Sequence, residues 1–341
     1  MARHRASRKG KLLALSAAAV AGVLTAVWLT RPDGGTADSP AGSPAPVPAP
    51  PPSLYVEPAG PAIDQVRAYE AEGRTADAAL LRRIADRPVA AWLADPDTAR
   101  AGQVAAAATA AAQIPVLTLY YIPHRDCSGG HSAGGAPSAA AYTAWVAAVA
   151  QALTGHRAIV ILEPDAVAQA AEDCLTPAQR DERYRLLTEA IRTLTANPQL
   201  SVYLDGGNPT WITDPARMAT ALRQAGVAGA DGFALNVANF ETTASNVAYG
   251  TEVSGHLRDA HFVIDTSRNG NGPARKSAGH THWCNPSGRA LGDPPTLTTG
   301  HTLVDAYLWI KRPGESDGAC GADAPPAGQW WPKYALELAR G

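Results

Sequence analysis

The sequence predicts an α/β fold in which parallel strands form a barrel surrounded by helices. Strand-like and helix-like segments alternate along the chain, an order typical of a parallel sheet covered by helices. Residues 158–165 read Ala-Ile-Val-Ile-Leu-Glu-Pro-Asp, an apolar run that suits a strand buried on both faces. Polar residues gather where the predicted strands end, which indicates a polar cleft across one face of the barrel.

The predicted elements begin with a strand over residues 114–122 and a helix over 137–154, with Pro137 near its start. The others are a strand at 158–163, a helix at 177–195 opened by Thr176-Pro177, a strand at 201–205, a helix at 214–225 that ends at Gly226, a strand at 231–237, a segment near 244–258, strands at 261–265 and 305–310, and a final helix at about 331–340. Because Pro164 cannot donate a backbone hydrogen bond, we expect the third element to end there and to present Asp165 at its carboxyl edge.

The N-terminal region predicts export. Residues 1–32 combine a basic start with an uncharged apolar stretch, which is typical of a signal peptide or a signal anchor. The protein is therefore expected to be secreted, or to be extracellular and anchored to the membrane through residues 12–29. Residues 33–53, rich in Pro, Ala, Gly and Ser, predict an extended linker. Residues 54–341 then suit one barrel-sized domain, which we expect to be monomeric.

Charge and cysteine usage exclude several kinds of site. The net charge is −2 and the basic residues form no stripe outside the N-terminus, so no nucleic-acid surface is predicted. The cysteines lack CxxC spacing, which disfavours zinc and favours two disulfides in an exported chain, with three possible pairings. His280 and His282 lack ligand partners at suitable spacing, so we interpret them as loop or cleft-wall residues.

The residues at the predicted strand ends favour glycoside hydrolysis. The polar segments are 120–126, 163–165, 205–208, 236–239, 265–268 and 311–317. They supply several carboxylates, and the aromatic residues that accompany them are Tyr120, Trp92, Trp211, Trp283 and Trp309. Glycosidases use two carboxyl groups as acid and base, and aromatic faces stack on sugar rings. The Asn-Gly-Asn-Gly cluster lacks the lysine of a phosphate loop.

A series of motifs along residues 54–341 resembles the cellulases of glycoside hydrolase family 6. The motifs are Tyr120-x-x-Pro123-x-Arg125-Asp126-Cys127 with Ser132-Ala133-Gly134-Gly135, Leu162-Glu163-Pro164-Asp165, Tyr203-Leu204-Asp205-Gly206-Gly207, Asn236-Val237-Ala238-Asn239, the run from Ile264-Asp265 to Asn271-Gly272, Trp283-Cys284-Asn285-Pro286, and Lys311-x-Pro313-Gly314-Glu315-x-Asp317-Gly318. Their number and order make a chance match negligible.

The resemblance implies an inverting β-1,4-glucanase on a distorted, incomplete TIM-like barrel, with a β-1,4-glucan as substrate and neither metal nor cofactor. It implies that Asp165 is the general acid, that Asp126 raises the pKa of Asp165, and that Asp317 is the base. Tyr120 and Ser132 match positions that steer sugar distortion and the hydrolytic water. The implied substrate-binding residues are Trp92, Asp205, Asn208, Trp211, Asn239, Arg268, Trp283, Lys311 and Glu315. The implied disulfides are Cys127–Cys174 and Cys284–Cys320.

One residue departs from the family pattern, and the mode of attack has alternatives. Asn208 stands where the family usually has histidine; it can hydrogen-bond a sugar hydroxyl but cannot titrate near neutrality. The domain is short for tunnel-forming loops, so we expect an open cleft and internal cleavage of glucan chains. The alternatives are a chain-end-acting cellobiohydrolase of the same family and a non-catalytic glucan-binding protein.

Overall fold

The computed structural model describes residues 52–127, 130–172, 174–275, 282–321 and 323–341. The predicted signal segment and most of the predicted linker lie outside these ranges, as does His280. Residues Pro50–Gly341 form one compact unit. Among the described residues, no helix is both long and apolar enough to cross a bilayer.

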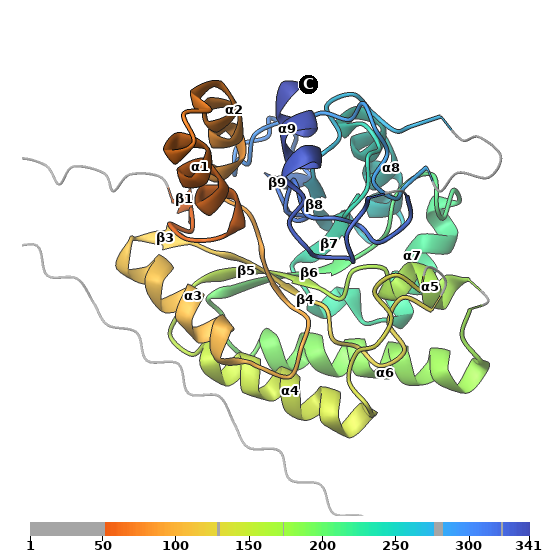
Figure 1. Ribbon diagram of the computed structural model, residues 1–341. Helices are drawn as coiled ribbons and strands as arrows, with labels where there is room; N and C mark the ends of the chain where they lie inside the picture. The colour runs from red at the N-terminus through yellow and green to blue at the C-terminus, as the bar shows by residue number, and fades with distance from the viewer. Residues whose placement is uncertain (1–51, 128–129, 173, 276–281, 322) are drawn as a thin grey trace, which may run out of the picture. The chain divides into compact units, whose positions relative to one another are not determined.

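The central sheet has seven parallel strands and curls into an incomplete barrel (Figure 1). In spatial order they are β2 Ala91–Leu93, β4 Val116–Leu119, β5 Ala158–Leu162, β6 Leu200–Asp205, β7 Gly232–Leu235, β8 His261–Asp265 and β9 Val304–Leu308. Spatial order follows chain order, so consecutive strands are neighbours. The edge strands β2 and β9 form no ladder with each other; beside them, the Ala90 amide donates to the Trp309 carbonyl at 3.0 Å. The predicted distorted, incomplete barrel is confirmed.

Helices cover the outer face of this sheet. They are α3 Ala99–Ala110, α4 Ala139–Ala152, α6 Pro177–Leu194, α7 Pro215–Gln224 and α8 Thr243–Gly255. Alternate residues of β5 face opposite ways: Val160 packs in the large core beneath the helices, whereas Ile159 and Ile161 belong to the smaller core inside the barrel. This arrangement explains the continuous apolar run, because both faces of the strand are buried.

A smaller group of elements packs beside the barrel. Helices α1 Pro61–Ala71, α2 Thr75–Ala85 and α9 Pro332–Arg340 share a third apolar cluster, and Figure 1 shows them together above the sheet. Strand β1 Ser53–Leu54 pairs with β3 Gln113–Ile114 in a separate two-stranded sheet. The sequence analysis predicted α9 but none of the elements before residue 113.

Four predicted strands end earlier than expected, and those predicted at 231–237 and 305–310 end at Leu235 and Leu308. The strand predicted at 158–163 ends at Leu162, because Glu163 adopts a left-handed conformation (φ 49°) that turns its side chain toward the preceding strand. The strand predicted at 114–122 is divided at Pro115, which lacks an N–H, into the end of β3 and β4. It ends at Leu119, and beyond it the Tyr121 and Ile122 amides donate to the Glu163 carboxylate.

Helix boundaries follow the predicted signals closely. The α6 helix begins with a capping box, in which the Thr176 hydroxyl accepts from the Gln179 amide and the Gln179 side chain accepts from the Thr176 amide. Gly226 follows α7 with φ 84°, a conformation that favours glycine. Two shorter helices connect these elements, α5 Ala166–Ala171 and the single 3-10 turn Val227–Gly229.

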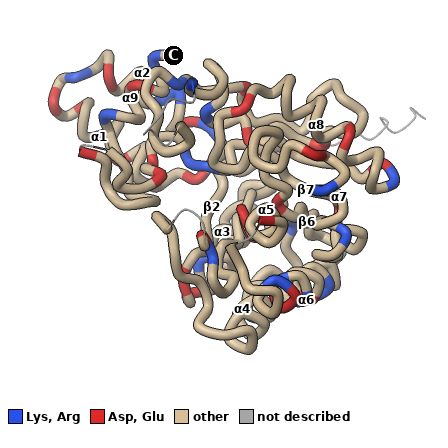
Figure 2. Tube along the Cα trace, turned by 90° about the vertical axis from the view of Figure 1, so that its right-hand side faces the viewer, with Lys and Arg blue, Asp and Glu red and all other residues tan. Residues whose placement is uncertain are grey.

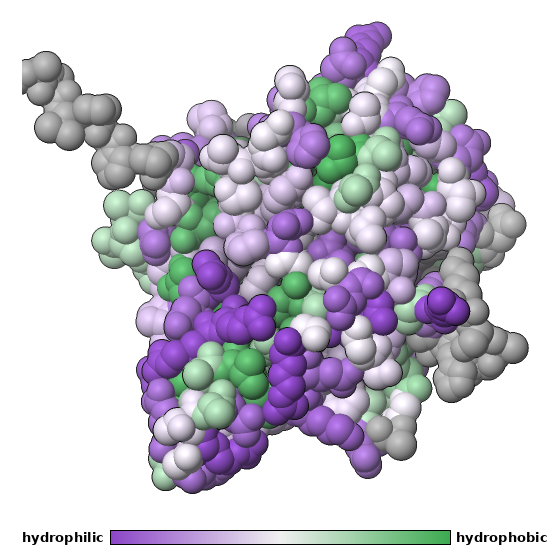
Figure 3. Space-filling model, turned by 90° about the horizontal axis from the view of Figure 1, so that it is seen from above, coloured by the Kyte–Doolittle hydropathy of each residue, from purple (hydrophilic) through white to green (hydrophobic). Residues whose placement is uncertain are grey.

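The surface mixes charge and polarity. Figure 2 shows Lys and Arg interspersed with Asp and Glu along the described trace, for example on α6. In Figure 3, hydrophobic residues on the face seen from above form small separate patches among hydrophilic ones.

Gly250 of α8 tests the helix–sheet packing. A Cβ at this position would lie 2.4 Å from the Phe262 ring, which itself stacks on Phe233. We expect Gly250→Ala to lower the free energy of unfolding by about 1–3 kcal/mol through overpacking. Urea unfolding measures the change. The matched control is Gly255→Ala at the end of the same helix, where a Cβ meets nothing within 4 Å and stability should not fall. Equal stability of the two variants would contradict the packing described here.

Candidate active site

A cleft of about 770 Å³ crosses the molecule where the sheet strands end. Most of the residues predicted for the site line it, and they are Trp92, Tyr120, Asp126, Ser132, Asp165, Asn208, Trp211, Asn239, Trp283, Lys311, Glu315 and Asp317. The strand ends thus bring together side chains that are up to 225 positions apart in the sequence (Trp92 and Asp317). Asp205 and Arg268 do not line the cleft.

Three buried carboxylates at strand ends lie behind the cleft and hold its loops. Glu163 accepts backbone hydrogen bonds from residues 121 and 122, each at 3.0 Å to one oxygen. Asp205 accepts from the amide of Asp165 at 2.9 Å and from that of Gly207 at 3.1 Å. Asp265 accepts from Ala238 at 3.0 Å and Lys311 at 2.9 Å. Burial raises the pKa of all three, that of Glu163 to about 7.

Asp165 follows β5 directly and lies at the start of α5. Its backbone is left-handed, with φ 70°, and its amide is held by Asp205. The Tyr120 hydroxyl donates to one of its oxygens across 3.5 Å. The pKa of Asp165 is raised to about 7, chiefly because burial disfavours the charged form, with the negative charge of Asp126 as the second cause. This carboxyl group therefore keeps its proton well above the usual pH range of an aspartic acid.

Asp126 lies in a loop that folds back over the cleft wall. Its carboxylate accepts from the Ser132 amide at 2.6 Å, while Arg125 donates to the Ser132 carbonyl at 2.8 Å and to the Ala94 carbonyl at 2.8 Å. The disulfide between Cys127 and Cys174 joins this loop to the chain that follows α5. The loop that carries Asp126 is thus tied to the helix that begins at Asp165.

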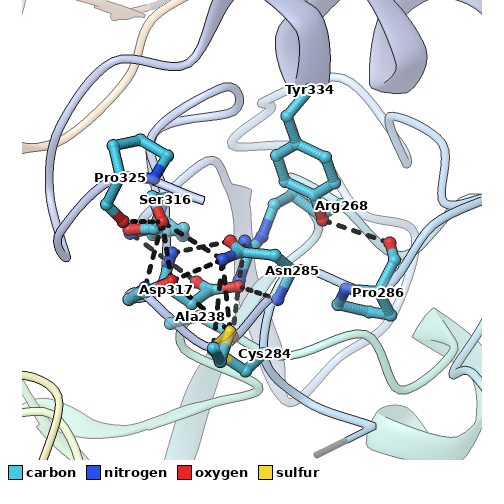
Figure 4. The surroundings of a disulfide bond; sticks show 12 residues. Ala238, Arg268, Cys284, Asn285, Pro286, Ser316, Asp317, Pro325 and Tyr334 are labelled. Atoms are coloured by element: carbon cyan, nitrogen blue, oxygen red, sulfur yellow. Dashed lines mark hydrogen bonds and ion pairs between the residues drawn. A yellow bond between two sulfur atoms is a disulfide. The ribbon is translucent and has the colours of Figure 1, made fainter. Parts of the chain in front are cut away.

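Asp317 lines the cleft, and Figure 4 shows it beside Asn285 and Ser316. Its carboxylate accepts from Arg268 at 2.9 Å and from the Asn285 amide at 2.9 Å, and its other oxygen lies 3.7 Å from the Lys311 ammonium. Only 6% of the side chain is exposed. Two cations therefore flank this carboxylate, in contrast to Asp165, whose strongest charged neighbour is an aspartate.

Asn285 has a role that the sequence analysis did not assign. Its side-chain oxygen accepts from the Asp317 amide at 2.8 Å, and its side-chain nitrogen donates to the Gly318 carbonyl at 2.8 Å. The neighbouring Cys284 is bonded to Cys320, so the disulfide joins the segment between β8 and β9 to the loop after β9. The signal in the sequence was its place directly after a cysteine of the Trp-Cys-Asn-Pro motif. Both disulfides have the sequential pairing expected from the resemblance.

Asp205 and Arg268 are buried behind the residues that line the cleft. The resemblance implied that both bind the substrate, but neither side chain lines the cleft. Arg268 is fully buried because it spans the gap between Asp317 and the Ala238 carbonyl, and its guanidinium lies 4.3 Å from the centre of the Phe240 ring. Asp205 is 1% exposed, since its oxygen faces the Asp165 and Gly207 amides. Both side chains orient residues that do line the cleft.

The aromatic residues divide into cleft walls and core. Trp92, Trp211 and Trp283 line the cleft, and Trp92 meets the Tyr120 ring edge-on at 5.5 Å between centroids. Trp309 is 3% exposed and donates to the Asp293 carbonyl at 2.9 Å, so it is a core residue and not a cleft aromatic as its place at a strand end suggested.

The remaining predicted residues have local partners within the cleft wall. Asn208 accepts from the Thr210 and Trp211 amides at 3.0 and 3.1 Å, so it shapes the turn beneath Trp211. Glu315 lies 3.4 Å from Arg312, and burial raises its pKa, whereas burial lowers that of Lys311. Asn239 also lines the cleft.

The cleft also contains residues that the sequence analysis missed, namely Arg125, His131, Gln169, Thr210 and Arg312. His131 meets the Trp283 ring edge-on, at 5.7 Å between centroids. His282 lines the cleft, as expected of a wall residue. Among the described residues, no group of three or more His, Cys, Asp or Glu side chains could hold a metal ion.

Comparison with known proteins agrees with this architecture. Endoglucanase 1 of Streptomyces halstedii is 42% identical over 298 residues, covering 84% of this chain and 88% of that protein. Endoglucanase A of Cellulomonas fimi is 44% identical over 292 residues, covering 84% of this chain and 61% of the relative. A 1,4-β-D-glucan cellobiohydrolase of Pyricularia oryzae is 32% identical over 272 residues, covering 64% of this chain and 55% of that protein.

A solved structure gives the same result for the fold. The endoglucanase Cel6 of Mycobacterium tuberculosis, in complex with methyl-cellobiosyl-4-deoxy-4-thio-β-D-cellobioside, superposes with a TM-score of 0.79 at 46% sequence identity, covering 85% of this chain and 97% of that one. The model of the glycosyl hydrolases family 6 matches residues 51–341. This chain therefore belongs to glycosyl hydrolases family 6, the cellulase family that its sequence motifs resemble.

Proposed function

We propose that this protein is an inverting endo-β-1,4-glucanase in which Asp165 is the general acid and Asp317 the base. The observation that carries the proposal is the contrast between the two cleft carboxyl groups. Burial and Asp126 favour the protonated form of Asp165, whereas Arg268 and Lys311 flank Asp317. A pair of carboxyl groups in such different environments is what acid–base catalysis requires.

The chemistry follows from these environments. Asp165 gives its proton to the glycosidic oxygen as the bond to the anomeric carbon breaks, and Asp317 takes a proton from the water that attacks the opposite face. In inverting glycosidases the two carboxyl groups stand roughly 6.5–9.5 Å apart, which leaves room for that water. Tyr120 keeps its proton, because burial raises the pKa of its hydroxyl, and it supports Asp165 as a neutral donor.

The remaining parts of the cleft would bind the glucan. Trp92, Trp211 and Trp283 offer ring faces for sugar stacking, and Asn208, Asn239, Lys311 and Glu315 offer polar groups for hydroxyls. Ser132 belongs to the loop that Asp126 holds, and it would contact the sugar or the water. We place the catalytic domain at residues 54–341, the linker at 33–53, and the export signal or anchor at 1–32.

The stereochemistry of the product is the most direct test. We expect the first product of a cello-oligosaccharide to be the α-anomer, because attack on a β-linked sugar inverts its configuration. Proton NMR at early times distinguishes the anomers before they equilibrate. A β-anomer formed first would rule out the inverting mechanism.

The Asp165→Ala variant decides between an enzyme and a binding protein. We expect turnover to fall by about 100-fold or more, with oligosaccharide binding retained. If the wild-type protein binds glucan and neither form turns it over, the chain is a glucan-binding protein and the proposal fails.

The pH dependence should depend on Asp126. Because Asp165 must hold its proton, we expect kcat/KM to fall as the pH rises through about 7. Asp126→Asn removes a like charge, so the pKa of Asp165 falls and the alkaline limb moves to lower pH. The control is Asp259→Asn, an exposed position beyond α8 near the amino end of β8. An alkaline limb that stays in place in Asp126→Asn would contradict this coupling.

The mode of attack is tested by viscosity. We expect the viscosity of carboxymethylcellulose to fall quickly relative to the reducing ends released, since internal cuts shorten chains fastest. The support for this mode is the identity of 42% and 44% with relatives named endoglucanases. A slow fall in viscosity, with cellobiose as the main product, would favour the cellobiohydrolase alternative.

A further inference from the structure

Helix α6 buries an arginine beneath the two loops that carry Asp126 and Asp165. Arg183 is 2% exposed, although it belongs to a helix whose neighbouring charged residues face solvent. Its guanidinium donates to the Pro123 and His124 carbonyls at 3.0 and 2.7 Å, and to the Ala166 carbonyl at 3.4 Å. It also donates to the side chain of the cleft residue Gln169, at 3.1 Å.

These bonds join segments that are separate in the sequence. The carbonyls at 123 and 124 precede Asp126 by two to three residues, and the carbonyl at 166 follows Asp165 directly. One planar side chain therefore spans the two loops, and the fixed fork of an arginine sets the distance between them. A lysine, which has a single nitrogen, cannot contact all four acceptors in this geometry.

The loops need such support because their backbones are strained. His124, Asp126, Glu163 and Asp165 all adopt left-handed conformations, with φ of 57°, 53°, 49° and 70°. Non-glycine residues rarely adopt this region, and surrounding contacts must compensate for its cost. Arg183 contributes contacts on both sides of the strained segments.

All four hydrogen-bond acceptors of Arg183 are neutral, and the acidic groups that act on its charge are Glu163 and, more weakly, Asp165. The groups that face Asp165 come from several elements: Tyr120 after β4, Asp126 from its loop, Asp205 at the end of β6 and Arg183 from α6. Among these groups, Arg183 is the one that carries a positive charge. That charge stabilises the ionised form of Asp165, which forms when Asp165 gives up its proton.

We propose that Arg183 is a positioning residue for the general acid, which fixes the Asp126 loop against the start of α5 and holds Asp165 in line with the leaving oxygen. The inference rests on the proposed function, since it requires Asp165 to be the acid. Arg183 itself lies beneath the loops and does not line the cleft.

The test compares Arg183→Met, which loses the charge and the hydrogen bonds, with Arg183→Lys, which keeps only the charge. The control is Arg185→Met on the same helix, where the side chain is 60% exposed. Each variant is assayed on a cello-oligosaccharide and on a 2,4-dinitrophenyl cellobioside, whose good leaving group needs little help from an acid.

We expect Arg183→Met to lose about tenfold or more in kcat on the oligosaccharide and much less on the dinitrophenyl substrate. Its alkaline limb should move to higher pH, because loss of the cation raises the pKa of Asp165. Arg183→Lys should lose kcat with the same dependence on the leaving group while its alkaline limb stays near that of the wild type. Arg185→Met should match the wild type.

Equal losses on both substrates, or wild-type kcat in Arg183→Met, would overturn the inference. If Arg183→Met does not fold, Arg183→Lys provides the test. A larger loss of kcat on the oligosaccharide than on the dinitrophenyl substrate supports the inference, and equal losses overturn it. Asp165→Ala separates the two proposals: turnover of the oligosaccharide by that variant would refute the acid assignment. If Asp165→Ala is inactive and both Arg183 variants behave as the wild type, only the inference about Arg183 fails.

Discussion

The buried carboxylates at the strand ends are the interaction on which the cleft depends. Parallel strands leave their loops without ladder partners at the carboxyl edge, and buried N–H groups must find acceptors elsewhere. Glu163 supplies them to the loop after β4, Asp205 to the turn that begins at Asp165, and Asp265 to the loops after β7 and β9. Each carboxylate lies at the end of its own strand and accepts backbone hydrogen bonds from the loop that follows a neighbouring strand. The strand ends therefore form a connected frame.

This frame explains how two carboxyl groups of the same cleft have different charged neighbours. Asp165 is placed by a backbone bond to Asp205, and its own oxygens meet a phenol and the charge of Asp126 instead of a cation at close range. Asp317 lies in a loop closed by a disulfide, where Arg268 reaches it from beneath. Asp317 is therefore paired with Arg268 and Lys311, whereas the strongest charged neighbour of Asp165 is an aspartate.

The sequence predicted the barrel, the strand that leads to Asp165 and most of the cleft residues, because these follow from apolar runs and from polar strand ends. It could not separate the carboxylates that line the cleft from those buried behind it. Asp205 and Asp165 both follow an apolar strand, and only the conformation of the backbone after each strand decides which side chain faces solvent. The frame residues therefore had the same signature as the catalytic ones.

Arg183 shows a second limit of sequence reasoning. An arginine is normally solvent-facing, although Arg183 lies three and four residues before Leu186 and Leu187 and so falls on the buried face of α6. Three of its four hydrogen-bond partners are backbone carbonyls, which every residue possesses and which no motif records. The helices α1 and α2 were missed for a related reason, since they pack on α9 from the far end of the chain.

Asn208 shows how a polar residue of the cleft can hold the backbone of its own turn. Asn208 uses one side-chain oxygen to accept the Thr210 and Trp211 amides, as asparagine does in turns. A histidine has one acceptor nitrogen in its neutral form and none when protonated, so it could not make both bonds while remaining sensitive to pH. In this chain the position stabilises the turn beneath Trp211. Asn208 therefore fixes the backbone of the turn whose Trp211 lines the cleft wall.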